Sequence, residues 1–128
     1  MADAHTFGSA RKKGVRQGLN ERQIEADCHF ALTLRLLGLR WRPAILWKVA
    51  EGVCGYGELK RALPGIADTA LSRELAALRQ AGLLHRTEIP RGLARATVYG
   101  LTPRGSSLLP LLAEMHQWGE AERCSDAR

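Results

Sequence analysis

The stretch ADTALSRELAALRQAGLLHR, from Ala67 to Arg86, has the pattern of a helix with two unlike faces. At about 100° per residue, Leu71, Leu75 and Leu78 fall on one side, which is typical of a helix packed on a core. The opposite side carries small or hydrogen-bonding side chains and a single cation (Thr69, Arg73, Ala76 and Gln80), with Ser72 on the flank. That second face is either simply solvated or suited to lie against a partner.

Turn and capping signals bound this helix on both sides. Pro64-Gly65 is a strong turn signal before it. We expect Asp68 or Ala67 to begin the helix, and Asp is the better N-cap of the two. Gly82 is expected to end it.

The residues before this stretch predict three further helices. The first is expected over about residues 21–37, with apolar residues on more than one side. The second has Pro43 in its first turn and ends at Gly52, and a short third helix is expected near Tyr56 to Leu63.

After the stretch, the hydrophobic period changes to that of strands. Leu83–Ile89 and Ala96–Leu101 read as two strands, joined by an exposed loop over Pro90–Arg95. A last helix starts at Thr102-Pro103, runs to about Gly119 and is kinked or briefly broken by Pro110. This order predicts a mainly α (α+β) fold, a winged helix-turn-helix with a two-stranded β-hairpin wing and additional N- and C-terminal dimerisation helices.

Composition bounds the class of protein. The chain has 128 residues, 45% of them hydrophobic, and a formal net charge of +6. This suits one basic domain that meets a polyanion, most commonly nucleic acid. Its three scattered cysteines imply neither a disulfide framework nor a zinc site, so we expect no metal and no cofactor. With no apolar run suited to a bilayer, we expect a cytoplasmic protein without a membrane partner.

Three segments are expected along the chain. Residues 1–20 read as a flexible basic tail, residues 21–119 as the winged domain with its dimerisation helices, and residues 120–128 as a polar tail. The N-terminal tail is interpreted as a solubilising extension, with a phosphate-contacting arm as the alternative.

The outer face of the helix and several cations are consistent with double-stranded DNA as the partner. Small side chains let a helix enter the major groove, where Arg can grip guanine. We expect the base-reading residues to be Thr69, Ser72, Arg73 and Ala76. Backbone or minor-groove contacts are expected from Arg40, Arg42, Lys60, Arg61, Arg91 and Arg95.

The ordered set of short motifs resembles the HxlR-type winged-helix transcriptional regulators of bacteria and archaea. The family's F-x-E-L segment looks like Tyr56-Gly57-Glu58-Leu59, and its LPGI segment is Leu63-Pro64-Gly65-Ile66. Further matches are Cys28, Gly38-Leu39-Arg40-Trp41, Ile45-Leu46, Leu71-Ser72, Gly82-Leu83, Leu101-Thr102 and Trp118-Gly119. The resemblance covers about residues 28–119 and implies a DNA-binding regulator without catalytic activity.

The resemblance also implies a role for Cys28, because some members of this family sense oxidants or electrophiles through the N-terminal cysteine. A sensing thiol needs thiolate character and access, and Asp27 beside it opposes ionisation. The alternative is a half-buried packing residue. The small effector, if one exists, is not indicated by the residues.

Apolar residues in the first and last helices predict a homodimer, which would bind a palindromic operator. The expected interface residues are Phe30, Leu34, Leu37, Leu108, Leu111, Leu112, Met115 and Trp118. The alternative is that the last-helix residues all pack within one subunit.

Two other classes of function remain as alternatives. A winged-helix protein-interaction module would dock an acidic protein on the same face. A thiol enzyme using Cys28 and His29 is disfavoured, because adjacent residues on a helix point in different directions.

Overall fold

The computed structural model describes residues 28–38 and 40–126, and falls into two units that divide after Gly38. In the first unit, one helix is described, α3 (His29–Leu37). Cys28, in extended conformation, is its N-cap, so this helix begins later than the expected residue 21. The predicted basic tail and residues 21–27 lie outside the described part of the chain.

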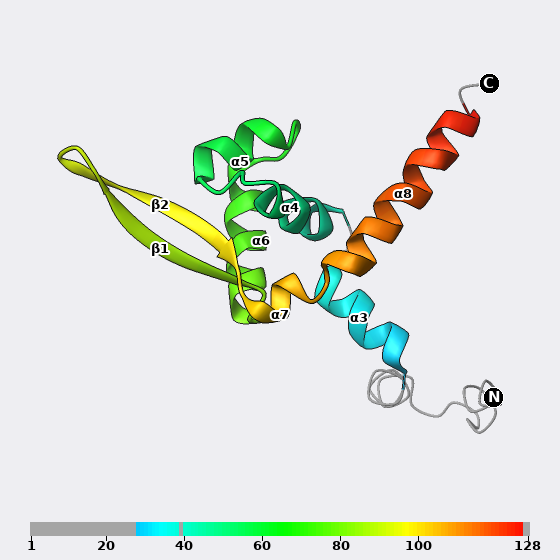
Figure 1. Ribbon diagram of the computed structural model, residues 1–128. Coiled ribbons are helices and arrows are strands. Elements are labelled where there is room, and N and C mark those ends of the chain that lie inside the picture. The colour runs from blue at the N-terminus through cyan, green and yellow to red at the C-terminus, as the bar shows by residue number, and fades with distance from the viewer. Residues whose placement is uncertain (1–27, 39, 127–128) are drawn as a thin grey trace. The chain divides into compact units, whose positions relative to one another are not determined.

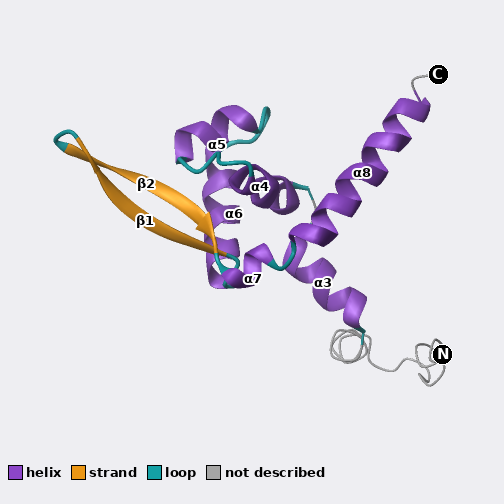
Figure 2. Cartoon of the chain, viewed as in Figure 1, coloured by secondary structure: helices purple, strands orange, loops and turns teal. Residues whose placement is uncertain are grey.

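The second unit contains the predicted winged helix-turn-helix (Figures 1 and 2). Its helices α4 (Trp41–Ala50), α5 (Tyr56–Ala62) and α6 (Asp68–Gln80) precede the hairpin of β1 (Leu84–Arg91) and β2 (Ala94–Leu101). Two helices follow, α7 (Pro103–Ser106) and α8 (Leu109–Asp126). The fold class expected from the sequence is thereby confirmed.

The core of this unit is aliphatic and lies where α4, α5, α6 and the start of β1 meet. Leu71, Leu75 and Leu78 are buried on the inner side of α6, as their spacing predicts. The other buried apolar side chains of this group are Ile45, Leu46, Val49, Leu59, Leu63, Ile66, Leu83 and Leu84.

Helix α6 begins at one of the two expected residues, but Asp68 is not its N-cap. Ala67 is the extended N-cap, and Asp68 occupies the first helical position. The Asp68 carboxylate does not cap α6 but accepts a hydrogen bond from the Tyr56 hydroxyl of α5. The preceding turn forms as predicted, with Gly65 at φ 92°, a region that favours glycine.

The wing, which we define as the β1–β2 hairpin, is longer and tighter than predicted. The expected six-residue loop is a two-residue turn, Gly92-Leu93, and Arg91 and Arg95 lie on the strands. Gly92 has φ 63° and Leu93 does not have positive φ, which matches the hairpin turn that needs glycine at its first position. Pro90 and the cations beside it therefore belong to an exposed two-stranded ribbon that extends away from the helices (Figure 1).

A third short segment joins the wing at its base. Gly55 forms an isolated antiparallel bridge with Val98, and the Tyr99 amide donates to the Cys54 carbonyl at 2.8 Å. The loop before α5 thus runs beside β2. This pairing attaches the wing to the helix-turn-helix.

The end of β2 is tied to the start of β1 through Thr102. Its hydroxyl donates to the Gly82 carbonyl at 2.6 Å and accepts from the Gly105 amide at 3.0 Å, as the predicted N-cap of α7. Gly105 has no room for a side chain, because a Cβ there would overlap the Leu83 carbonyl oxygen. These contacts fix where the wing leaves the domain.

The expected last helix is two helices, and it ends later than predicted. α7 ends at Ser106, and Pro110 stands in the first turn of α8, where a missing N–H is tolerated. Residues 120–126, which were expected to belong to a polar tail, continue α8 to Asp126. Nowhere in residues 28–38 or 40–126 is there a helix long and apolar enough to cross a membrane.

Candidate DNA interface

The outer side of α6 is exposed, as a recognition helix requires. Thr69, Ser72, Arg73 and Ala76, which we call the groove face, are all exposed, whereas the leucines of the same helix are buried. The side chain of Arg73 is 70% exposed and lies 3.6 Å from Glu74 Oε2, its one ion pair among the residues that the structure describes. The sequence therefore identified the side of α6 that is available to a partner.

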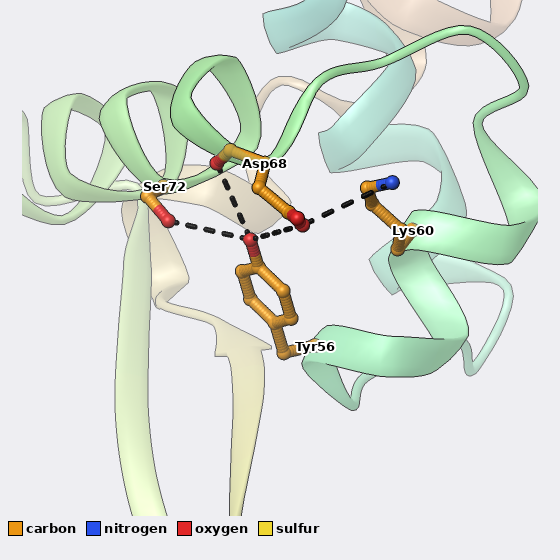
Figure 3. A network of polar contacts seen from close by, with 4 residues as sticks. All are labelled: Tyr56, Lys60, Asp68 and Ser72. Carbon is orange, nitrogen blue, oxygen red and sulfur yellow. Dashed lines mark hydrogen bonds and ion pairs between the residues drawn. The ribbon is translucent and has the colours of Figure 1, made fainter.

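A polar network connects the groove face to α5 (Figure 3). The Tyr56 hydroxyl lies 3.1 Å from Asp68 Oδ1 and 3.3 Å from Ser72 Oγ. Lys60 Nζ lies 3.9 Å from the same Asp68 oxygen. Lys60 is thus beside the groove face, but its charge is partly offset by Asp68.

Sequence reasoning assigned no role to Tyr56. The one indication in the sequence is that Tyr56, the first residue of α5, occupies the position where the family's F-x-E-L segment has Phe. The contact joins residues 12 and 16 positions apart across a turn, so it depends on how α5 packs against α6. Periodicity along one helix does not contain that information.

Arg42 lies at the start of α4, as expected, and forms an ion pair with α6. Its Nε is 2.5 Å from Glu74 Oε1, and the two side chains are 28% and 15% exposed. The pair ties α4 to α6. Because its guanidinium is paired with Glu74 inside the protein, Arg42 is a weaker candidate for a phosphate contact than the sequence indicated.

The other cations predicted to contact the DNA backbone differ in their exposure and in their ion pairing. Arg40 is exposed and lies 4.2 Å from the ring centre of its neighbour Trp41. Arg61 and Arg91 are exposed and have no ion-pair partner among the residues described. Arg95 is 66% exposed and lies 3.8 Å from Glu88.

Strand register places the two wing-tip arginines on opposite faces of the ribbon. Pro90 pairs with Arg95, whereas Arg91 pairs with Ala94. Successive side chains alternate between faces, so Arg95 shares a face with Glu88, and Arg91 lies on the other. A wing that lies with one face on DNA would use one of these arginines more than the other.

Exposed apolar side chains occur on both helices that were expected to form a dimer. Leu111, Met115 and Trp118, at i, i+4 and i+7 of α8, are 40%, 45% and 70% exposed. Phe30 and Leu34 of α3 are 79% and 62% exposed. These five residues form apolar surfaces that a monomer leaves in water.

The remaining three predicted interface residues are less available to a partner. Leu37 and Leu112 are buried at 2% and 3% exposure within one chain, and Leu108 is half-buried in the turn before α8. Within the second unit, α8 packs on α4, where Trp47 stacks on His116 with ring centres 5.2 Å apart. Leu112 therefore belongs to the core.

Cys28 is half-buried at the start of α3, and its carbonyl accepts the Leu32 amide at 3.2 Å. Cys54 is half-buried and Cys124 is exposed. In the described segments, no group of three His, Cys, Asp or Glu side chains could hold a metal ion.

Comparison with known proteins identifies the family to which this geometry belongs. The HxlR-like helix-turn-helix family matches residues 36–126. The chain belongs to this family. It is a transcriptional regulator, as the resemblance in its motifs implies. Cys28 lies outside the residues that the HxlR-like match covers.

Individual relatives agree with the assignment to the HxlR-like family. The uncharacterized HTH-type transcriptional regulator YdzF of Bacillus subtilis (strain 168) is 43% identical over 94 residues, which are 73% of this chain and 85% of YdzF. The structure is similar to that of the redox regulator HypR in its oxidized form, with a TM-score of 0.69, 28% identity and coverage of 73% of this chain and 96% of HypR. The reduced form of the transcriptional regulator YodB from B. subtilis gives a TM-score of 0.63 at 26% identity, covering 73% and 91% of the two chains.

Proposed function

We propose that this HxlR-like regulator binds a specific double-stranded DNA sequence as a homodimer, with α6 in the major groove. The observation that supports this most is the exposed groove face on a helix whose opposite side is anchored by three buried leucines. A rigid helix with small outward side chains can approach base edges closely.

Within the groove, Arg73 is the residue best suited to read a base. Its guanidinium is exposed and can donate two hydrogen bonds to guanine O6 and N7. Thr69 and Ser72 can bond to base edges, and the Ala76 methyl can contact a thymine methyl.

The exposed cations outside α6 would supply contacts that do not depend on sequence. Arg61 on α5 and Arg91 on the wing have the most available charge, and Arg40 and Arg95 are also exposed. Such contacts to phosphate position a protein and make its affinity depend on salt. We expect Lys60 and Arg42 to contribute less to phosphate binding, because the carboxylates of Asp68 and Glu74 lie beside them.

The exposed apolar residues of α3 and α8 support the homodimer. Large apolar side chains such as Phe30 and Trp118 are costly to leave in water when they occur in groups. A two-fold dimer would cover them and present two copies of α6 to a palindromic operator.

A response to oxidants through Cys28 is a further part of the proposal. It is supported by the likeness to HypR, a redox regulator, in both its oxidized and reduced forms. The measurement is operator affinity before and after mild oxidant, in the wild type and in Cys28→Ser. A wild-type affinity that does not change with oxidant contradicts the proposal.

Selection of bound sequences from random duplex DNA tests the proposed DNA binding. We expect an enriched motif with two-fold symmetry and half-sites about 10 base pairs apart, one helical turn. Recovery of no motif at a salt concentration where binding persists would instead favour general attraction between a basic protein and a polyanion.

A further inference from the structure

The Tyr56 hydroxyl makes more polar contacts with α6 than one hydroxyl hydrogen can serve. It lies 3.3 Å from the Asp68 carbonyl oxygen, 3.1 Å from Asp68 Oδ1 and 3.3 Å from Ser72 Oγ (Figure 3). All three contacts are in the first turn and a half of the recognition helix. Their donor and acceptor directions are therefore linked.

The number of hydrogens available to donate determines which group is the donor in each of these contacts. A phenol has one hydrogen to donate, whereas a carbonyl and a carboxylate oxygen can only accept. Either Asp68 oxygen can accept that hydrogen, and the carboxylate, which also lies 3.9 Å from Lys60 Nζ, is the stronger acceptor. The Tyr56 hydrogen therefore goes to Asp68 by preference, and in that arrangement the contact with Ser72 forms when Ser72 donates its hydrogen to the Tyr56 oxygen.

This arrangement leaves Ser72 with lone pairs and no hydrogen for any partner outside the protein. Ser72 is exposed on the groove face, while Tyr56 is half-buried between α5 and α6. A serine hydroxyl that rotates freely can donate or accept, and so distinguishes bases poorly. A serine whose hydrogen is already used can only accept.

We propose that Tyr56 is a specificity-determining residue that acts through Ser72, by making the Ser72 hydroxyl an acceptor toward DNA. Ser72 then favours a base that presents a donor in the major groove, which is the N6 amino group of adenine or the N4 amino group of cytosine. It disfavours the O6 and N7 acceptors of guanine and the O4 acceptor of thymine. This inference rests on the proposed placement of α6 in the major groove.

Tyr56 stands at the first position of the segment that resembles the family's F-x-E-L. The HxlR pattern has Phe in the F-x-E-L segment, where this chain has Tyr56. Phe has the same ring and no hydroxyl, so it cannot accept a hydrogen bond from Ser72. Base preference at one position of the operator should therefore separate this chain from relatives that carry Phe there.

Tyr56→Phe tests the proposal, because it removes one oxygen and keeps the ring. The operator position read by Ser72 is first located as the base pair whose preference changes in Ser72→Ala. Affinity is then measured on four duplexes that differ only at that base pair. We expect wild type to favour adenine or cytosine about fivefold, and Tyr56→Phe to bring the four affinities to within about twofold.

Two controls separate a loss of polarity from a disturbed fold. Tyr99→Phe removes the other tyrosine hydroxyl of the chain, on β2, and should leave the preference unchanged. In the Ser72→Ala background, Tyr56→Phe should have no further effect on the four affinities. Thermal unfolding of each variant shows whether the domain is intact.

Failure of this inference differs from failure of the proposed function. If Ser72→Ala changes a preference and a folded Tyr56→Phe does not, the role of Tyr56 is wrong while DNA reading by α6 stands. A wild-type preference for guanine or thymine at that base also overturns it. If no sequence is enriched from random DNA at all, the proposed function itself fails.

Discussion

Glu88 lies beside Arg95 on one face of the wing, with Glu88 Oε1 3.8 Å from Arg95 Nη1. The other oxygen of Glu88 lies 3.8 Å from Arg86 Nη2. A single exposed carboxylate thus partly offsets two cations of the element that is proposed to meet the DNA backbone. It would also repel phosphate directly.

Glu88→Gln should therefore bind DNA more tightly than the wild type. We expect about a two- to fivefold gain at low salt, on operator and random duplexes alike, because backbone contacts are not sequence-specific. Fluorescence anisotropy over a salt series measures it. Glu122→Gln, the same change on α8, is the control, and an equal gain in that variant would show that only net charge matters.

Arg42→Ala should lower stability more than it lowers DNA affinity. The change leaves the Glu74 carboxylate, whose side chain is 15% exposed, without the partner that ties α6 to α4. We expect a loss of about 1–3 kcal/mol in the free energy of unfolding, measured by urea denaturation. Arg40→Ala, two residues earlier, should leave stability nearly unchanged. Comparable stability losses in both variants would argue against the Arg42–Glu74 tie.

Arg73→Ala should weaken binding to the operator more than binding to random DNA. Loss of a bidentate contact to guanine costs about 1–3 kcal/mol and relaxes the preference at one position. Arg91→Ala should instead lower both affinities and reduce the salt slope by about 1. Each variant is titrated against the operator and against random duplex DNA, and the losses of affinity are compared. Equal losses on the two duplexes for Arg73→Ala would remove Arg73 from base reading.

Leu111→Asp should disrupt the homodimer, because it puts a charge in the exposed apolar row of α8. Sedimentation at micromolar concentration is expected to show a dimer for the wild type and a monomer for the variant. Leu93→Asp is the matched control, since Leu93 at the wing tip is fully exposed and lies outside that row. A wild-type monomer, or a dimer that survives Leu111→Asp, contradicts the proposed interface.

Much of this fold could be predicted because its signals are local. The leucines of α6 recur at helical spacing, Thr102-Pro103 begins a helix, and Pro64-Gly65 makes a turn. The strands of the wing were predicted too short, because the expected loop included Pro90, although an exposed ribbon tolerates proline. The tight turn of the wing uses the positive φ of Gly92, a residue that the expected six-residue loop contained among others.

The candidate site could be predicted in outline but not in its pairings. Exposure of the groove face follows from the helical period of α6. By contrast, the Arg42–Glu74 pair and the Tyr56 network join side chains from different helices, at separations that no periodic pattern encodes. Which cations are free, and which hydroxyl hydrogens are already used, depends on that packing.

The affinity of Ala76→Glu for the selected operator tests the central claim most directly. Ala76 is exposed in the middle of the groove face, so the change should leave the fold intact while adding bulk and negative charge where α6 would meet DNA. Ala121→Glu makes the same substitution on the exposed side of α8. We expect Ala76→Glu to lose operator binding by about 100-fold or more while Ala121→Glu keeps it. Operator binding that survives Ala76→Glu in a folded dimer would contradict the placement of α6 in the major groove.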